Sequence, residues 1–432
     1  MSKDSEKIGL LEAISIGIGG MVGGGIFSVL GVAVSLAKGG TPVAFLIAGI
    51  LAILTSYSYV KLSSAFPERG GTVKFINKGF GENTFSGALN NLLWLSYIIM
   101  LSLYASAFGS YAPQLFKIFS DSSLNFHFYA SAIIIFATAI NYYSISFVGK
   151  VESFAVIVKL IILLSFVVLG GFALVGNENI SQLSITNWEN PIKLFAGGMV
   201  IFVAYEGFEL IANAATDIRN PEKNIPRAYY IAVGFVIILY ILIAIITVGT
   251  LPFNEISTAK DYVLAEAAKP MLGKTGFVII TNTALISTFS AINASLLGGS
   301  RVNYEIAKDH ELPKHFLREF WKKPVGLMTT SILTLVLTNI LQIESISIAG
   351  SLAFLIIFGI VNFVAFKISK DIKAGKTIPL IAFILCIVAI FALVIEQFAE
   401  NKIGIFTAIG IIIFCFVGEF FYRKSRSKNI ES

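Results

Sequence analysis

A single lysine stands in the middle of a long apolar stretch. Lys159 lies within residues 156–172, which read VIVKLIILLSFVVLGGF and contain no other charged residue. A cation in a membrane helix costs about 2.5–3.5 kcal/mol on insertion scales, so it normally faces a protein or water-filled interior. If Lys150 marks the helix end, Lys159 lies about 13 Å deep in a ~30 Å core, too deep to snorkel easily. We therefore expect its proton to be used in function.

A run of glycines could bind an anion. Six of residues 17–25 are glycine, and each costs about 1 kcal/mol relative to alanine inside a helix. Packing through Gly19 and Gly23, a GxxxG pair, is the alternative explanation, but it does not account for the consecutive Gly23, Gly24 and Gly25. A helix that unwinds there exposes N–H groups and a positive dipole end, which bind a carboxylate.

A second interrupted segment lies at residues 197–209. It contains Gly207 in its interior and two acids, Glu206 and Glu209, at membrane depth. Paired, glycine-interrupted segments in the two halves of a chain are typical of transporters built from inverted repeats. One broken helix would offer N–H groups and the other carbonyl groups, which together suit a zwitterion. A free α-amino acid is the predicted ligand.

The elements that must position these residues are membrane-spanning helices. Of 432 residues, 56% are hydrophobic and 13% are charged, whereas a soluble protein has about 25% charged residues. Apolar windows of about 20 residues recur along the chain, which predicts an all-α polytopic membrane protein with about twelve transmembrane helices. The expected spans are 8–37, 41–65, 85–116, 126–146, 149–176, 192–216, 227–251, 274–300, 325–343, 346–366, 378–398 and 403–422.

The two interruptions fall in the first and sixth of these spans, which predicts the internal organisation. We expect one integral membrane domain over residues 1–432. A five-helix repeat at about 8–176 would be followed by a second, inverted repeat at about 192–366. Two extra helices at about 378–422 lie outside the repeats.

The distribution of charge orients the chain and excludes several functions. Most Lys and Arg residues fall in segments that a cytoplasmic N-terminus would place inside, so a multi-pass protein of the cell membrane with both termini in the cytoplasm is expected. The net charge of +6 is spread over short loops, which favours contact with the lipid bilayer and not nucleic-acid binding. The cysteines and histidines have no metal-ligand spacing, and no catalytic motif is present, so no metal, cofactor or enzymatic activity is expected.

Four motifs resemble those of the amino acid–polyamine–organocation (APC) superfamily. In chain order they are Gly23-Gly24-Gly25-Ile26-Phe27, Phe202-x-x-Tyr205-x-Gly207-Phe208-Glu209, Asn220-Pro221-Glu222-Lys223-Asn224-Ile225-Pro226-Arg227-Ala228 and Ala307-Lys308-Asp309-x-x-Leu312-Pro313. The motifs lie in register along the first ten spans, so the resemblance covers nearly the whole chain. Residues 151–164, which include Lys159, are similar to the fifth helix of a proton-coupled amino-acid transporter of this superfamily.

The resemblance implies a LeuT-type fold with alternating access and a broken first and sixth helix. The substrate carboxylate would meet backbone amides of the first helix, and the ammonium would meet backbone carbonyls of the sixth. By position, these residues are Gly23, Gly24, Gly25 and Ile26 for the carboxylate, and Phe202, Val203 and Glu206 for the ammonium. Phe202 would also act as a gating aromatic.

The resemblance also implies how a proton would be coupled to transport. In sodium-coupled relatives of this fold a cation lies between the first and eighth helices. Gly19, Ser287 and Ser290 match that region here. The Lys159 ammonium is placed to occupy the cation position, which implies amino-acid and proton symport without sodium.

The chain departs from the similar proton-coupled transporter at four positions. Gly24 and Gly25 stand where that transporter has alanine and serine, so one hydroxyl for the carboxylate is missing. Glu206 and Glu209 replace residues that do not ionise. Glu209 matches an acidic position common elsewhere in the superfamily, whereas Glu206 is unusual. The predicted substrates are neutral amino acids, but a Glu206 that points into the site would favour a cationic one.

Two alternatives to proton symport stay open. One is an amino-acid exchanger of the same fold, and the other is a membrane receptor that senses an amino acid without moving it. Lys159 favours the coupled transporter, because an exchanger needs no titrating cation there. The second broken helix and the lack of a soluble signalling domain favour a transporter over a receptor.

Three further regions receive simpler predictions. Trp94, Tyr97 and Tyr104 are expected to pack the third span, with Tyr97 as a possible pocket residue. Residues 255–274 are expected to form an outer loop with a short amphipathic helix. Residues 301–323 are expected to form a solvated cytoplasmic connection.

Overall fold

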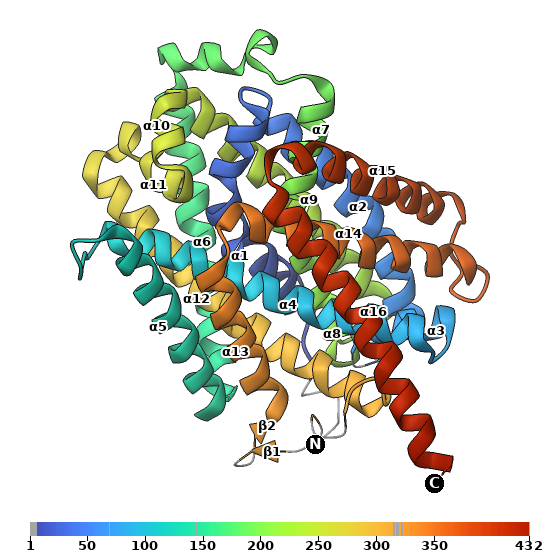
Figure 1. Ribbon diagram of the computed structural model, residues 1–432. Coiled ribbons are helices and arrows are strands. Elements are labelled where there is room, and N and C mark those ends of the chain that lie inside the picture. The colour runs from blue at the N-terminus through green and yellow to red at the C-terminus, as the bar shows by residue number, and fades with distance from the viewer. Residues whose placement is uncertain are drawn as a thin grey trace.

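The structure is a computed structural model, which describes residues 7–68, 70–143, 145–313, 316, 319–320 and 323–431, without side chains for 145–154, 319–320, 323–324 and 427–431. The chain forms a bundle of long helices (Figure 1). Within the described residues, ten helices are long and apolar enough to cross a membrane, and a bent pair of helices makes an eleventh span. A shorter apolar helix of 16 residues, α13, lies where the remaining span was predicted. The all-α polytopic architecture is confirmed.

The long helices are α1 (Leu10–Ala37), α2 (Thr41–Ala65), α4 (Thr84–Tyr111), α5 (Ser122–Tyr143), α6 (Ile145–Leu174), α9 (Pro221–Thr250), α12 (Lys269–Lys308), α14 (Ile343–Lys367), α15 (Thr377–Glu400) and α16 (Lys402–Glu431). The bent span consists of α7 (Pro191–Val200), the 3-10 helix η5 (Phe202–Glu209) and α8 (Leu210–Asn213). The remaining elements are α3 (Thr72–Phe80), α10 (Phe253–Thr258), α11 (Val263–Glu266), α13 (Val325–Ile340), the short 3-10 helices η2 (Ala112–Gln114), η3 (Glu178–Leu183), η4 (Ile185–Asn187), η6 (Ala215–Asp217) and η7 (Lys260–Tyr262), and the paired strands β1 (Glu319–Phe320) and β2 (Lys323–Pro324).

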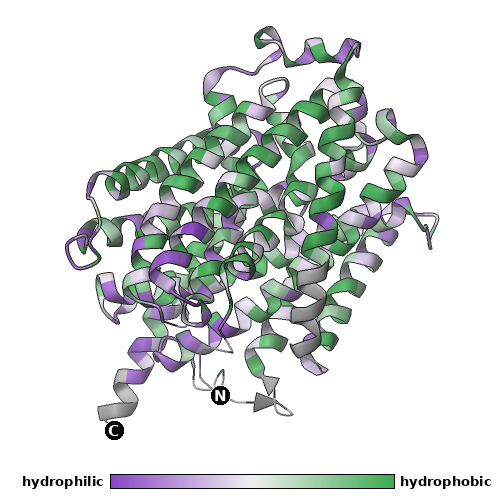
Figure 2. Cartoon of the chain, turned by 180° about the vertical axis from the view of Figure 1, so that it is seen from behind, coloured by the Kyte–Doolittle hydropathy of each residue, from purple (hydrophilic) through white to green (hydrophobic). Residues whose placement is uncertain are grey.

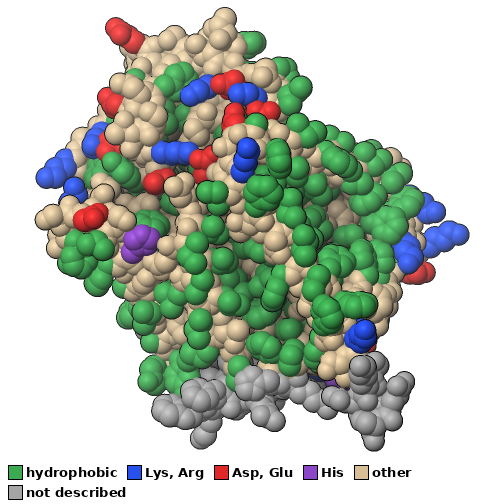
Figure 3. Space-filling model, in the orientation of Figure 1, with side chains coloured by type: hydrophobic (Ala, Val, Ile, Leu, Met, Phe, Trp, Pro, Cys, Tyr) green, Lys and Arg blue, Asp and Glu red, His purple; other side chains and the backbone are tan. Residues whose placement is uncertain are grey.

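Burial separates the central helices from the peripheral ones. The most apolar windows of α1 and α4 are each 89% buried, whereas those of α5, α15 and α16 are 28% buried. A helix that is apolar on all sides is stable either in the core or against lipid. Hydrophobic residues accordingly make up most of the helical segments, and hydrophilic residues are more frequent toward the helix ends and in the loops (Figure 2). The face seen in Figure 3 is largely hydrophobic between charged groups at its margins.

The two ends of the bundle carry different elements. In Figure 1, α10 and α11 lie at the top, which we call the upper end, and the C-terminal end of α16 lies at the bottom, the lower end. The predicted loop helix in residues 255–274 is confirmed by α10 and α11. At Gly31 of α1, an added β-carbon would overlap the carbonyl of Lys260, so this loop lies directly against α1.

Two details of the sequence prediction were wrong. The span predicted to begin at residue 227 begins at Pro221, where α9 starts, because the missing N–H of proline costs nothing in the first turn of a helix. Residues 301–308 are not a solvated connection, because α12 continues to Lys308 with Val302 and Ile306 buried. Helix α3 was not predicted. The side chain of Lys150, used to estimate the depth of Lys159, lies outside the described side chains.

Candidate substrate and coupling site

Helix α1 departs from helical geometry at one residue. Val22 has φ −83° and ψ 15°, and helix continues on both sides. The carbonyl of Met21 accepts a hydrogen bond from the Tyr240 hydroxyl at 2.6 Å. A side chain that takes over a main-chain partner is a recognised cause of a kink. The interruption is therefore present one residue before Gly23, and the run of glycines itself stays helical.

Glycines bring the two interrupted spans together. A β-carbon added to Gly207 of η5 would overlap the main chain of Gly20 in α1. One added to Gly25 would lie 2.9 Å from the Cα of Ala204, closer than real side chains approach. Because only glycine permits this approach, backbone meets backbone where the substrate was predicted to bind.

The other two glycines of the run face different helices. A β-carbon on Gly23 would lie 2.5 Å from the β-carbon of Ala291 in α12, and one on Gly24 would overlap the ring of Tyr104 in α4. Ile26, the fourth residue predicted to bind the carboxylate, is buried. Helix packing, the alternative reading of the glycines, thus operates at all three positions of the run.

The sixth span bends by 40° between α7 and η5. The carbonyl of Val200, at the end of α7, accepts hydrogen bonds from Ser351 at 2.7 Å and Ser347 at 2.9 Å. The N–H of Val203 donates to the Ser351 hydroxyl at 3.1 Å. Two serines of α14 therefore satisfy main-chain groups that the break frees. Phe202 is fully buried beside them.

Glu206 lies at the centre of the bundle with half of its carboxylate satisfied. Its side chain is 4% exposed, and Oε1 accepts a hydrogen bond from the Tyr104 hydroxyl at 3.2 Å. Oε2 has no hydrogen-bond partner among the described residues. Since the ring of Tyr104 covers Gly24, the carboxylate is held close to the glycine run. A buried oxygen without a partner is costly, which suits a group that takes up a proton or a ligand.

Glu209 is one 3-10 turn further along η5 and is fully satisfied. It accepts hydrogen bonds from the Thr72 hydroxyl at 2.8 Å and the Tyr97 hydroxyl at 3.2 Å. Tyr97 in turn accepts from the amide of Asn213 at 2.8 Å. The network joins α3, α4 and α8 around one buried acid.

Lys159 is fully buried and points at α1. Its Nζ donates a hydrogen bond to the carbonyl of Gly19 at 3.1 Å. Ser287 and Ser290 of α12 are also buried, and α12 packs against both α6 and α1. The hydroxyl of Ser287 has no hydrogen-bond partner in the described part of the chain. The structure thus brings Lys159 to the predicted residue of α1, on the N-terminal side of the kink.

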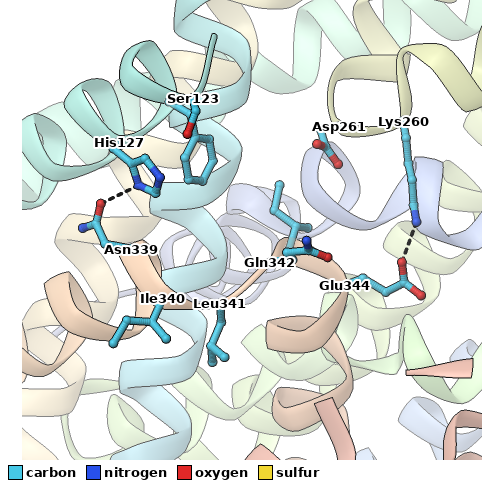
Figure 4. Close-up of a pocket in the computed structure, with 11 residues that line it drawn as sticks. Ser123, His127, Lys260, Asp261, Asn339, Ile340, Leu341, Gln342 and Glu344 are labelled. Atoms are coloured by element: carbon cyan, nitrogen blue, oxygen red, sulfur yellow. Dashed lines mark hydrogen bonds and ion pairs between the residues drawn. The ribbon is translucent and has the colours of Figure 1, made fainter. Parts of the chain in front are cut away.

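A polar cavity of ≈550 Å³ lies at the upper end of the bundle. Figure 4 shows His127 of α5 directed at Asn339 of α13, and Lys260 of η7 directed at Glu344 of α14. The first pair is hydrogen-bonded at 2.8 Å and the second is an ion pair at 2.6 Å. The ion pair ties the loop that crosses α1 to the start of α14.

A second ion pair joins α3 to the end of α12. Lys74 of α3 contacts Asp309, the residue after α12, at 2.6 Å, and Asn77 donates to the same carboxylate at 3.1 Å. Burial lowers the pKa of Lys74, but its hydrogen bond to Asp309 and the charges of Asp309 and Glu305 outweigh burial and raise that pKa overall. The lysine therefore stays charged at neutral pH.

The chain belongs to the amino acid permease family, whose model matches residues 8–420. It is 35% identical over 425 residues to a protein of uncharacterised function from Methanocaldococcus jannaschii, covering 98% of this chain and 97% of that one. It is 30% identical to the inner membrane transport protein YbaT of Escherichia coli, covering 98% of each chain. It is 26% identical to the serine/threonine exchanger SteT of Bacillus subtilis, covering 88% of this chain and 87% of that one. The protein is therefore a membrane transporter of amino acids and not an enzyme, and the superfamily resemblance is confirmed.

Several residues of the central region were not predicted from the sequence. Tyr104 was expected only to pack the third span, and Tyr97 to pack it or to line the pocket, but each donates to a buried glutamate. Thr72 and Lys74 lie on α3, which was not predicted as a helix. Tyr97 and Tyr104 are seven residues apart, so they share one face of α4. That spacing was the available signal.

Proposed function

We propose that this protein is a sodium-independent symporter that imports an amino acid together with a proton across the cell membrane. The observation that carries the proposal is the contact between the fully buried Lys159 and the carbonyl of Gly19. A buried ammonium can be retained only with acceptors around it, and Gly19 supplies one beside the kink of α1.

The proposed site follows the two interrupted spans. The substrate carboxylate binds amides of Gly23, Gly24, Gly25 and Ile26, and its ammonium binds carbonyls near Phe202, Val203 and Glu206. The close approach of Gly20 to Gly207 supports this placement, because it brings the main chain of α1 next to the main chain of η5. In the present arrangement the glycines are packed, so α1 must move from Tyr104 to admit substrate.

In the proposed cycle, protonated Lys159 holds α1, α6 and α12 together, with Ser287 and Ser290 as further acceptors. When the proton leaves toward the cytoplasm, the contact between Lys159 and α1 weakens. The N-terminal half of α1 can then move away from α6 and α12. A proton can bias transport only through such a difference between states. The proposal also includes a LeuT-type arrangement of two five-helix repeats, at about 8–176 and 192–366. It places both termini in the cytoplasm. The presence of two kinked spans supports the repeats and the LeuT-type arrangement.

Uptake into proteoliposomes tests the proposal. Labelled alanine should accumulate when the outside is acidic, and accumulation should be the same in sodium and potassium buffers. Lys159→Ala should abolish accumulation, while Lys223→Ala, which removes an exposed lysine at the start of α9, should not. Sodium-dependent uptake by the wild type would contradict the proposal.

A second candidate is obligatory exchange, which the 26% identity to a serine/threonine exchanger favours. An exchanger would take up label only into liposomes preloaded with unlabelled amino acid. Proton symport predicts uptake into empty liposomes under a pH gradient.

The proposed substrates are neutral amino acids. The unpartnered Oε2 of Glu206 is the one observation that favours a cationic substrate instead, because an arginine or lysine side chain would satisfy it. Competition of alanine uptake by arginine, in the wild type and in Glu206→Gln, decides between them. Strong competition that disappears in the variant would overturn the neutral assignment.

A further inference from the structure

A serine of α14 is inserted into the main chain of the sixth span at the place where that span breaks. The hydroxyl of Ser351 donates a hydrogen bond to the carbonyl of Val200 at 2.7 Å and accepts one from the N–H of Val203 at 3.1 Å. A continuous 3-10 helix would join that carbonyl and that N–H directly. A side chain that enters a helical hydrogen bond is a recognised cause of a kink. Ser351 therefore holds this break open.

The contact between Ser351 and the break is buried and closely packed. Val200 and Ser351 are fully buried, and Val203 is 1% exposed. A β-carbon added to Gly350, the residue before Ser351, would lie 3.0 Å from a side-chain carbon of Val203, so glycine at this place lets α14 approach η5. A buried N–H or carbonyl that loses its partner is costly. The hydroxyl of Ser351 is therefore the partner that the fold provides for both main-chain groups.

The peptide group that Ser351 holds also carries one of the proposed ligands of the substrate. The N–H of Val203 and the carbonyl of Phe202 belong to one peptide group, which is planar and trans, so they point in opposite directions. Because Ser351 fixes the N–H, it also fixes the carbonyl, which faces away from α14. A carbonyl has two lone pairs, so a bond within η5 still leaves one for an ammonium group. Helix η5 packs against α1 as well as against α14.

We propose that Ser351 is a positioning residue for the substrate, because its hydroxyl directs the carbonyl of Phe202 at the substrate ammonium. This inference rests on the proposed function, which assigns the ammonium to main-chain carbonyls near Phe202 and Val203. Ser351 acts through one peptide group of η5 and not by touching the substrate. Its loss should therefore weaken binding of the α-amino group and leave the movement of the helices unchanged.

Ser347 provides a matched control. It is also a fully buried serine of α14, one turn before Ser351, and its hydroxyl donates to the same carbonyl of Val200 at 2.9 Å. Of the two serines, only Ser351 accepts a hydrogen bond from Val203 in the described part of the chain. Ser347→Ala thus removes one of two donors to Val200, whereas Ser351→Ala also frees the N–H of Val203.

Equilibrium binding of labelled alanine to the purified protein tests the proposal. Ser351→Ala should raise the Kd by about tenfold, because a misdirected carbonyl forms a weaker hydrogen bond to a charged group. Ser347→Ala should change the Kd by less than about twofold, and Ser351→Thr, which keeps the hydroxyl, should restore most of the affinity. In substrate counterflow, Ser351→Ala should raise KM and leave the maximal rate nearly unchanged. A serine that only stabilised the fold would not divide the effect in this way.

Equal Kd values for Ser351→Ala and Ser347→Ala would overturn the proposal, and so would a reduced maximal rate with an unchanged KM. Should Ser351→Ala fail to fold, as judged by size-exclusion chromatography, Ser351→Cys repeats the test with a thiol, which is a weak donor and a weak acceptor. Binding and counterflow need no net proton movement, so neither result depends on proton symport. A wild type that binds no alanine would overturn the proposed substrate and this inference with it.

Discussion

Two buried ionisable sites flank the kinked part of α1, and they are held in different ways. Lys159 reaches from the regular helix α6 to a main-chain carbonyl of α1. Glu206 and Glu209 lie on the irregular helix η5 and are held by hydroxyl groups. A carbonyl accepts from the charged ammonium more strongly than from a neutral amine, so it favours the protonated lysine. A hydroxyl donates to a carboxylate and accepts from a carboxylic acid, so it tolerates both forms.

Because of this difference, we expect the Lys159 site and the glutamate site to have different roles. The lysine contact should be strong when Lys159 is protonated and weak when it is neutral, as a coupling device requires. The glutamates should not move α1 when they titrate. Between them, Glu209 has hydroxyl partners on both oxygens and Glu206 has one. Glu206 is therefore the member of the pair for which we propose contact with a ligand.

The largest effect is expected where α1 meets Tyr104, since both sites depend on the position of α1. Gly24→Leu should abolish uptake, because any side chain there displaces the ring of Tyr104 and blocks the approach of substrate to backbone. Gly171→Leu is the control, since a β-carbon at that exposed glycine of α6 meets no atom within 4 Å. Ordinary uptake affinity in Gly24→Leu would reduce the glycine run to helix packing.

Lys159→Ala should have the next largest effect, and a selective one. Accumulation driven by a pH gradient should be lost, while substrate counterflow, which needs no net proton movement, should persist at a reduced rate. The measurement compares both modes in the same vesicles. Retained proton-driven accumulation would leave Lys159 a structural cation and remove the contrast with the glutamates.

The glutamate pair should separate specificity from stability. Glu206→Gln should change the order in which amino acids compete for uptake and change thermal unfolding little. Glu209→Gln should keep that order and lower the free energy of unfolding by about 1–3 kcal/mol, because it disturbs a fully bonded buried acid. Thermal shifts of the two variants measured beside their competition profiles would show this. A reversed pattern would exchange the roles of the two acids.

The smallest effect is expected at the lower end. Asp309→Asn weakens the ion pair with Lys74 and should lower stability by on the order of 1 kcal/mol, with a few-fold change in uptake rate. Lys78→Gln is the control, because the pair of Lys78 and Glu68 is long, at 3.8 Å, and exposed. Equal thermal shifts for the two variants would show that the pair of Lys74 and Asp309 stabilises the fold no more than an exposed pair does.

The sequence alone predicted the positions of the long helices and singled out Lys159. It did not predict the hydrogen-bond partners of Glu206 and Glu209. Apolar length predicts a span without any knowledge of its neighbours, so α2 was placed at its observed residues. Lys159 stood out because it is the lone charge in residues 156–172. The contact between Gly20 and Gly207 could not be predicted from local spacing, because the two residues lie in different halves of the sequence.

The partners of the glutamates were not predicted for the same reason. Tyr104 and Thr72 come from separate elements, and neither has a pattern that points to η5. The break in α1 was placed one residue late, because the number of glycines indicates flexibility but not which carbonyl Tyr240 will capture. Local composition therefore located the two interrupted spans, and tertiary contacts decided their detailed geometry.

Proton movement itself tests the central claim most directly. A pH-sensitive dye trapped inside proteoliposomes should report acidification when alanine is added outside in sodium-free buffer, and the signal should be absent in Lys159→Ala and present in Lys223→Ala. Alanine entry without acidification in the wild type, or acidification that persists in Lys159→Ala, would contradict proton symport through Lys159.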